Sequence, residues 1–463
     1  MKSRKKPVRR PKKPIRWWHV VLLVTLICLV AGGWCWYVRQ PAWAAHEALR
    51  LGADDDAEQL LEAAGKRWPQ QASWKADVEF LRARLARHRG KVREMHEHLL
   101  AARDAGYDLE KLKREQTLAK AQLGEMRGAE RDLATLLNDP RGDEQEICNA
   151  FIQGYLQIQQ FEAARQLLTS WAGDFPEDPR PLFLRGTVQM NIELWKEAEA
   201  DFRKALTIDP KHFQSAYHLA SVLLTQKHPD RAMEYFRIAA QDKTLKLTAL
   251  AGQGHCYRLL GKPEKARVLL EKILEDEPND VTASFELAKL DMDNGDYQKA
   301  RVRLEPIVAA DSRHTDARQQ LAVVLRVQGE EAKAQEHFLA VKEINEQLAN
   351  ASDLAERITM DASSADTRLQ IAKIYLQYGS RREGLMWLRS NLTIAPEHPA
   401  SLRELEEYYR VRYREEPGND RFLELAEEYQ RRQSVPPKSL PDAASGVGRR
   451  SHDHPRHRRW RDR

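Results

Sequence analysis

The chain has 463 residues, of which 42% are hydrophobic and 31% are charged, and its formal net charge is +6. The positive charge belongs to the two ends: residues 1–16 carry nine cations and no acid, residues 434–463 carry a net charge of +5, and the body between them is left at −8. An acidic body without a basic stripe argues against nucleic-acid binding, and the dominance of Ala, Leu, Glu, Arg and Lys favours a helical fold.

An apolar segment without Asp, Glu, Lys or Arg, residues 17–38, follows the basic N-terminus. As a helix it would be roughly 33 Å long, which is enough to cross the hydrocarbon core of a bilayer. Trp and Tyr residues stand at both of its ends, where their rings prefer the headgroup level. The segment is therefore predicted to be a transmembrane helix.

The distribution of cations predicts the orientation of this helix. Nine cations precede it and only Arg39 follows it closely, so the positive-inside rule places residues 1–16 in the cytoplasm, facing anionic lipids. The rest of the chain is then expected on the periplasmic or extracytoplasmic side of the cell (inner) membrane.

A cleaved signal peptide is the alternative interpretation of the same segment. Ala42-Trp43-Ala44 has the small-x-small form of a cleavage site. The apolar run is longer than an ordinary signal core, however, and Arg39 and Pro41 stand between it and that site. We therefore expect residues 17–38 to be retained as a signal anchor.

The remainder of the chain, residues 39–433, repeats itself every 34 residues. The clearest unit is 179–212, and the same frame continues through 213–246, 247–280 and 281–314. Its recurring large, small and proline residues are Leu182, Gly186, Trp195, Ala198, Phe202, Ala205 and Pro210.

These positions resemble those of the tetratricopeptide repeat. The resemblance implies an all-α fold, a right-handed superhelical solenoid of antiparallel helix pairs. The transmembrane helix predicted at residues 17–38 precedes it. About eleven units fit residues 39–433, with weaker ones at both ends and a sixteen-residue insertion at 349–364. The tail 434–463 is rich in Pro, Ser, Gly and Arg and is predicted to be disordered.

In this family the first helix of each unit lines a concave groove, at roughly its second, fifth, ninth and twelfth positions. Aromatic rings among amides and cations could hold an extended peptide there, because rings bury side chains and polar groups meet the main chain. The groove residues implied by the resemblance are Asn149, Gln153, Phe183, Thr187, Tyr217, Ser221, His255, Arg258, Phe285, Lys289 and Arg326.

Two known variants of the family do not fit. The lysine and asparagine clamp that binds chaperone C-termini is absent, because its positions read Asn149, Phe183, Tyr217 and Ala251. The C-terminal paired-cysteine metal module of a lipopolysaccharide-assembly subclass is absent as well.

The sequence contains no motif typical of an enzyme. It has no phosphate-binding glycine loop, nucleophile elbow, paired-cysteine zinc spacing or His-Glu-x-x-His. His452, His454 and His457 lie in the tail, which offers no fixed geometry for a metal, and Cys148 and Cys256 are predicted to be small buried residues. We therefore expect no catalytic activity, no cofactor and no metal.

The sequence favours a membrane-anchored scaffold that binds a protein or peptide segment through the concave groove. One alternative is a structural subunit of a cell-envelope assembly complex that uses the convex face. The others are a cleaved, secreted repeat protein and, least favoured, an enzyme with a site assembled across repeats.

Overall fold

The computed structural model describes residues 40–67, 72–124, 126–358, 364–417 and 420–434, and these residues form helices and connecting turns without any strand. A helical segment at 40–50 comes first. The helices that follow are α2 (Asp54–Arg67), α3 (Ala72–His88), α4 (Val92–Asp104), α5 (Leu109–Gln122), α6 (Met126–Asn138), α7 (Glu144–Gln157), α8 (Phe161–Asp174), α9 (Arg180–Asn191), α10 (Trp195–Ile208), α11 (Phe213–Thr225), α12 (Pro229–Ala239), α13 (Lys246–Leu259), α14 (Pro263–Asp276), α15 (Val281–Asp293), α16 (Tyr297–Ala310), α17 (Thr315–Val327), α18 (Glu331–Glu356), α19 (Ala365–Tyr378), α20 (Arg381–Ile394), α21 (Pro399–Glu415) and α22 (Asp420–Ser434).

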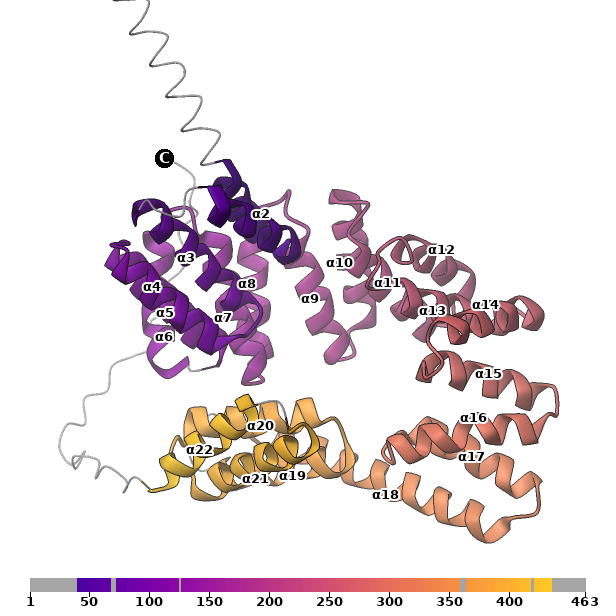
Figure 1. Cartoon of the computed structure of the whole chain (residues 1–463). Coiled ribbons are helices and arrows are strands. Elements are labelled where there is room, and N and C mark those ends of the chain that lie inside the picture. The colour runs from indigo at the N-terminus through magenta and orange to yellow at the C-terminus, as the bar shows by residue number, and fades with distance from the viewer. Residues whose placement is uncertain (1–39, 68–71, 125, 359–363, 418–419, 435–463) are drawn as a thin grey trace, which may run out of the picture. The chain divides into compact units, whose positions relative to one another are not determined.

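Successive helices from α3 to α18 pack as antiparallel pairs, which is the arrangement predicted from the 34-residue repeat (Figure 1). In the pair α9 and α10, a Cβ on Gly186 would lie 2.6 Å from the ring of Phe202. Ala198 is fully buried one turn away from that ring. The two small residues let the helices approach closely, and α10 ends shortly before Pro210, which cannot continue a helix.

The first helices of consecutive pairs also contact one another from α9 to α17. We call α7, α9, α11, α13, α15 and α17 the first-helix row. Their partners α8, α10, α12, α14, α16 and α18 are the second helices. All of the groove residues predicted from the sequence lie on the first-helix row.

The turn inside each pair contains one residue with a positive φ, and this residue recurs every 34 positions. The six residues are Gln159 (63°), Glu193 (59°), Lys227 (64°), Gly261 (68°), Gly295 (78°) and Gly329 (82°). Left-handed backbone suits glycine and strains other L-residues, so three turns are relaxed and three are strained. The period is therefore a property of the backbone as well as of the sequence.

The helix α18 has 26 residues and continues into the predicted insertion. No Pro or Gly occurs in residues 331–356, so nothing in the sequence ends the helix where the other second helices end. The hydroxyl of Tyr378 in α19 donates to Glu343 at 2.8 Å, which ties the next pair to this long helix. The first part of the insertion is thus an extension of α18.

The pairs are held together by a core that runs from one pair to the next. Phe151 and Leu168 are fully buried, and Cys148 and Cys256 are buried free thiols, as predicted. Burial raises the pKa of both thiols to about 12. Both cysteines therefore act as small apolar residues.

The chain divides into two compact units, the first ending at Thr393 and the second beginning at Ile394. In the second unit α21 packs on α22. The buried ring of Tyr409 is nearly parallel to that of Tyr429, with centroids 5.9 Å apart, and it also stacks on Phe422 at 6.2 Å. These rings form an aromatic core between two highly charged helices.

The predicted transmembrane segment 17–38 and almost all of the predicted tail 434–463 lie outside the described residues. Within the part of the chain that is described, every helix is too short or too polar to cross a bilayer.

Candidate functional site

The predicted groove residues gather in two clusters on the first-helix row. The first cluster, on α9 and α11, is built around the half-exposed ring of Phe183. This ring lies 5.1 Å from the ring of His212 and 5.6 Å from that of His218, measured between centroids. Tyr217 meets His218 edge-on at 5.5 Å. Phe183 and Tyr217, predicted separately, are therefore joined by a histidine that the sequence did not single out.

His212 is the last residue of the unit 179–212, which also contains Phe183, and it caps the N-terminus of helix α11. Its Nδ1 atom accepts from the backbone N–H of Ser215 at 3.3 Å, which satisfies one of the free donors at the helix start. Burial lowers the pKa of His212 and of His218, so both rings stay neutral near pH 7. The cluster is thus an uncharged aromatic surface.

The same arrangement recurs three repeats later. The ring of Phe285 in α15 lies 5.4 Å from the ring of His314, and His314 accepts from the backbone N–H of Ala317 at 3.2 Å. A phenylalanine on one first helix therefore rests against the histidine that caps the next first helix. Both contacts leave the rings half-exposed.

The second cluster, on α13 and α15, surrounds the carboxylate of Glu286, which is 3% exposed. Lys289 donates to Glu286 at 2.6 Å and Arg258 donates to it at 3.1 Å, while a ring nitrogen of His255 lies 3.4 Å away. Burial alone would raise the pKa of Glu286, but His255, Lys289 and Arg258 outweigh it and hold that pKa below its ordinary value. A buried anion thus fixes three predicted groove residues in one place.

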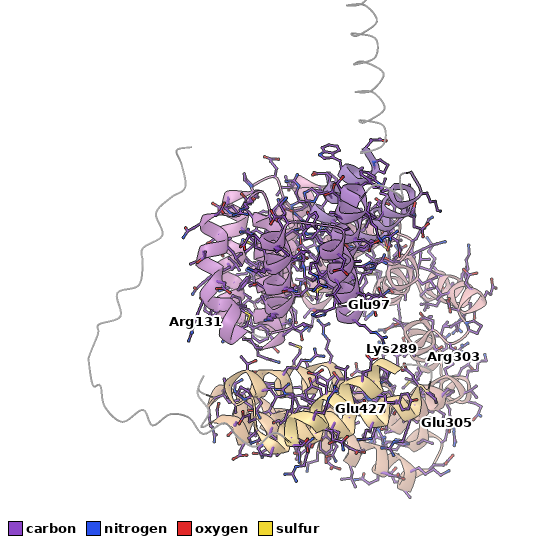
Figure 2. All side chains as sticks on the ribbon, turned by 60° about the vertical axis from the view of Figure 1, so that its left-hand side comes forward. Glu97, Arg131, Lys289, Arg303, Glu305 and Glu427 are labelled. Atoms are coloured by element: carbon purple, nitrogen blue, oxygen red, sulfur yellow. The ribbon has the colours of Figure 1, made fainter. Side chains whose placement is uncertain are left out.

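The Lys289 ammonium also lies over the ring of Phe285, 4.4 Å from its centroid (Figure 2 labels Lys289). This is a cation–π distance, and it combines an aromatic surface with a positive charge at one point of the first-helix row. Arg258 also lies 3.8 Å from the carboxylate of Asp293, so the two cations of this cluster face two carboxylates. Burial lowers the pKa of His255 and favours its neutral form.

The opposite side of α15 carries a second carboxylate. Asp291 is fully buried and accepts from Arg267 of α14 at 2.7 Å and from Arg303 of α16 at 2.9 Å. These ion pairs connect three consecutive helices. Asp291 therefore ties α15 to both neighbouring helices, while Phe285 and Lys289 lie on the other face of α15.

The remaining predicted groove residues are less closely grouped. Thr187 and Ser221 donate their hydroxyl hydrogens to carbonyls of their own helices, at 2.7 and 3.0 Å, which leaves them as acceptors only. Asn149 and Gln153 lie half-exposed on α7. Arg326 is exposed on α17, with its guanidinium 5.3 Å from the centroid of the Phe338 ring.

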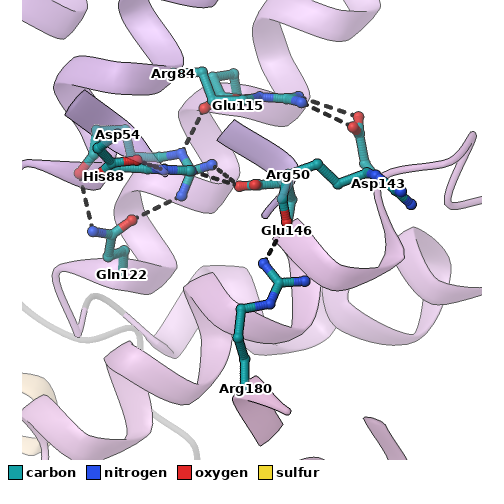
Figure 3. A network of polar contacts seen from close by, with 10 residues as sticks. Arg50, Asp54, Arg84, His88, Glu115, Gln122, Asp143, Glu146 and Arg180 are labelled. Carbon is teal, nitrogen blue, oxygen red and sulfur yellow. Dashed lines mark hydrogen bonds and ion pairs between the residues drawn. The ribbon is translucent and has the colours of Figure 1, made fainter. Parts of the chain in front are cut away.

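A buried network of charges in the N-terminal pairs was not predicted (Figure 3). Arg87 of α3 donates to Glu115 of α5 at 2.5 Å and to Glu146 of α7 at 2.6 Å. His88 bridges Glu146 at 2.8 Å and Asp54 of α2 at 2.9 Å. The network therefore connects four helices.

Arg84 completes this network. It donates to Glu115 at 3.2 Å and to both carboxylate oxygens of Asp143, at 2.9 and 3.2 Å. Arg84 and Glu115 are both less than 3% exposed. Because each buried charge has a partner of opposite sign, the network acts as a structural clamp between repeats.

The signal for these missed residues was present in the sequence. In the unit 76–109 the second, fifth, ninth and twelfth positions are Asp77, Phe80, Arg84 and Arg87. Extending the groove frame upstream of Asn149 would have selected them. The same frame could not have shown that the two arginines are buried, since that depends on Glu115 and Glu146 of later repeats.

Comparison with known families identifies the middle of the chain. Models of the tetratricopeptide repeat match residues 149–212, 183–246 and 257–313. These residues are tetratricopeptide repeats. The matches contain α8 to α12 and α14 to α16 in full, and they confirm the predicted resemblance over that stretch.

Solved structures of other proteins are similar to parts of this chain. PilW, described as a widely conserved type IV pilus biogenesis factor, is 20% identical over 41% of this chain and 89% of its own, with a TM-score of 0.38. PilF of Pseudomonas aeruginosa is 22% identical over 43% and 92%, also with a TM-score of 0.38. YrrB, described as a TPR protein with an unusual peptide-binding site, is 16% identical over 51% and 96%, with a TM-score of 0.29. No curated protein matches the sequence.

Proposed function

We propose that this protein is a membrane-anchored tetratricopeptide scaffold that binds an extended segment of a partner protein along the first-helix row. The observation that carries the proposal is the series of half-exposed rings and cations on consecutive first helices, from Phe183 and Tyr217 to Phe285 and Lys289. Rings at these points can bury side chains of the segment, and Arg258 and Lys289 can meet its carbonyl or carboxylate groups.

The rigidity of the row supports binding without rearrangement. His212, His314 and Glu286 fix the aromatic and cationic side chains before any partner arrives, so little side-chain entropy is lost on association. Because the contacts are spread over several repeats, each one contributes modestly to the binding free energy, and their sum gives the affinity for the segment.

Anchoring by residues 17–38 is part of the proposal. Its support is the uncharged, aromatic-flanked segment and the nine cations that precede it. Ala42 is 7% exposed inside the helical segment 40–50, so cleavage after Ala44 would cut a helix that packs in the core. We place residues 1–16 in the cytoplasm and the repeats on the extracytoplasmic side of the cell membrane.

Photo-cross-linking tests the binding face. Photoreactive residues replace Tyr217 or Phe285 in the row and, as matched controls, Val268 or Val302 on the second helices α14 and α16, which are 70% and 61% exposed. We expect one partner to be captured from the row and not from the controls. Capture of the partner from the controls alone would support the envelope-complex alternative and refute the proposed groove.

Protease protection tests the topology. Added protease should degrade the repeats in spheroplasts while the cytoplasm is still closed. Degradation that requires opening of the cytoplasm would show that the orientation is wrong, and recovery of a soluble form that begins near residue 45 would show that the anchor is cleaved.

A further inference from the structure

A cavity of about 820 Å³ lies among the N-terminal helices. Residues of the helical segment 40–50, of α3 and α5, and of the start of α7 line it. Its volume is that of a site for a ligand of several hundred daltons.

The lining of the cavity is rich in apolar rings. Phe80 and Tyr107 stack with centroids 4.4 Å apart and planes 18° from parallel. Trp74 is buried, and its indole N–H donates to the carbonyl of Ala64 at 3.0 Å, so its polar atom is already satisfied. Leu118 adds a buried aliphatic side chain. Such a surface favours an apolar ligand group.

The polar side chains inside the cavity already have partners. Arg84 donates to Glu115 at 3.2 Å and to both carboxylate oxygens of Asp143, and Glu115 also accepts from Arg87. His46 is half-buried, and burial lowers its pKa, so it adds no charge near pH 7. The interior therefore offers few hydrogen-bonding groups to the main chain of a peptide, whereas a hydrocarbon chain requires none.

Helix α5 supplies two cations to the lining. No carboxylate among the described residues pairs with Lys111, whose ammonium lies 5.9 Å from the centroid of the Tyr107 ring. Arg114 donates to two backbone carbonyls, at 2.8 and 3.0 Å, so its charge meets no carboxylate there. Burial raises the pKa of Tyr107, which keeps its hydroxyl a donor. An anion held at this side of the cavity would therefore find two cations.

The position of the cavity in the chain points to the source of its ligand. Gln40 and Trp43 line it, and Trp43 is five residues beyond the end of the predicted span at residue 38. Even a fully extended chain would place Trp43 no more than about 18 Å from the end of that span. The Trp43 side chain is 71% exposed, and tryptophan rings prefer the headgroup level of a bilayer. The cavity thus lies within reach of membrane lipid.

We propose that this cavity holds one acyl chain of an anionic phospholipid from the membrane in which the protein is anchored. The chain would lie against Phe80 and Trp74, and the phosphate would meet Lys111 and Arg114. A lipid held in this way would fix the first repeats at the membrane surface. The inference rests on the proposed anchoring by residues 17–38, and it is independent of partner binding at the first-helix row.

Photolabelling of the full-length protein in phosphatidylcholine nanodiscs tests the inference. The probe is phosphatidylglycerol with a diazirine in one acyl chain, and the control lipid is diacylglycerol with the same chains, which lacks the phosphate. Mass spectrometry should find both lipids attached to residues 17–38 to a similar extent. Residues 74–81 and 111–118 should be labelled about fivefold more by the phosphatidylglycerol than by the diacylglycerol.

Exposed variants on α5 locate the phosphate. Lys111→Glu should lower the labelling of residues 74–81 by phosphatidylglycerol about fivefold and leave that of residues 17–38 unchanged. Lys113→Glu is the matched control, because Lys113 is exposed on the same helix, outside the cavity lining, and pairs with Glu110 at 3.2 Å. This control should stay within about twofold of the wild type.

Competition with inorganic phosphate distinguishes a lipid from a soluble anion. An excess of inorganic phosphate should leave the labelling of residues 74–81 within about twofold, because the ion cannot replace the contacts of the acyl chain. Loss of the label under these conditions would assign the cavity to a soluble anion and overturn the proposal.

The remaining outcomes separate this inference from the anchoring. Label on residues 17–38 without label on 74–81 or 111–118 would refute the lipid site and leave the anchoring intact. Absence of label from residues 17–38 would refute the anchoring, and the lipid site with it. Equal labelling of the cavity by both lipids, or an equal effect of Lys111→Glu and Lys113→Glu, would show that no phosphate is recognised there.

Discussion

The Nε2 atom of His88 lies 2.8 Å from a carboxylate oxygen of Glu146, and Arg87 donates to the same oxygen at 2.6 Å. His88 ends α3 and Glu146 lies in the first turn of α7, so one buried carboxylate joins residues 58 positions apart. The cohesion of the N-terminal repeats depends on this contact.

Glu146→Gln should destabilise the N-terminal repeats by about 1–3 kcal/mol, because it removes the buried carboxylate that Arg87 and His88 share and leaves them only Glu115 and Asp54. Hydrogen exchange of α3 and α7 measures the loss locally. The control is Glu162→Gln, which breaks an exposed pair with Arg165 at 2.8 Å and should leave the hydrogen exchange of its helix unchanged. Equal protection in both variants would contradict the clamp.

The local stability of α3 should fall as the pH rises above 6.5. Burial alone would lower the pKa of His88, but Glu146 and Asp54 outweigh it and raise it. The stabilisation is therefore complete below about 6.5 and is lost as the pH rises through the higher folded pKa. Hydrogen exchange of the α3 amides at pH 6 and pH 9 should show this loss of stability at the higher pH in the wild type and in the control variant His228→Gln. The loss should be absent in His88→Gln.

The helix α11 should respond to pH in the opposite direction. Burial lowers the pKa of His218 and of His212, so the unfolded state binds protons more readily than the folded state. Stability is then complete above about 6.5 and is lost as the pH falls below it. Exchange of α11 amides should accelerate between pH 7 and pH 5, after correction for intrinsic rates, and His218→Phe should reduce the effect.

Two glycine substitutions should have opposite effects. A Cβ on Gly154 would lie 1.9 Å from the carbonyl oxygen of Ala121, a backbone atom that cannot move aside, so Gly154→Ala should cost several kcal/mol. Gly173 has nothing within 4 Å of the corresponding position, so Gly173→Ala should stabilise α8 by about 0.5–1 kcal/mol. Urea unfolding followed by circular dichroism measures both, and destabilisation by Gly173→Ala would refute the comparison.

The strained turns should gain stability from glycine. Glu193 adopts a φ of 59°, and Glu193→Gly should stabilise the repeat by up to about 1 kcal/mol, since glycine occupies this conformation without strain. The reverse change at the equivalent turn, Gly295→Ala at φ 78°, should destabilise by a similar amount. The midpoint temperatures of thermal unfolding of the two variants should therefore shift in opposite directions from that of the wild type.

Cys148 and Cys256 should resist alkylation in the folded protein. Burial raises the pKa of both thiols to about 12, so the thiolate fraction at pH 8 is very small and the reagent has no access. Mass spectrometry after treatment with N-ethylmaleimide should find both unmodified, and both modified after addition of guanidinium. Rapid labelling of the native protein would contradict their burial.

The sequence by itself predicted the all-helical pairs and the residues that build them. Gly186 marks the closest approach of the two helices of a pair, Phe202 fills the space beside it, and Pro210 marks the end of the second helix. The sequence shows these features because each depends only on neighbours within one repeat. The same local frame located Phe183, Tyr217 and Phe285 on the first-helix row. A recurring 34-residue pattern thus determines the repeat unit and which face each of its residues occupies.

Only the tertiary structure decided how charged and aromatic residues combine between repeats. Glu286 reads in the sequence as an ordinary helix acid, yet it is buried beneath His255, Arg258 and Lys289. Arg87 likewise reads as a solvated cation until α7, 59 positions later, covers it with Glu146. Burial of a charge depends on which distant helix packs against it, and a local pattern contains no information on that packing. The cavity lined by Phe80, Tyr107 and Lys111 exists for the same reason.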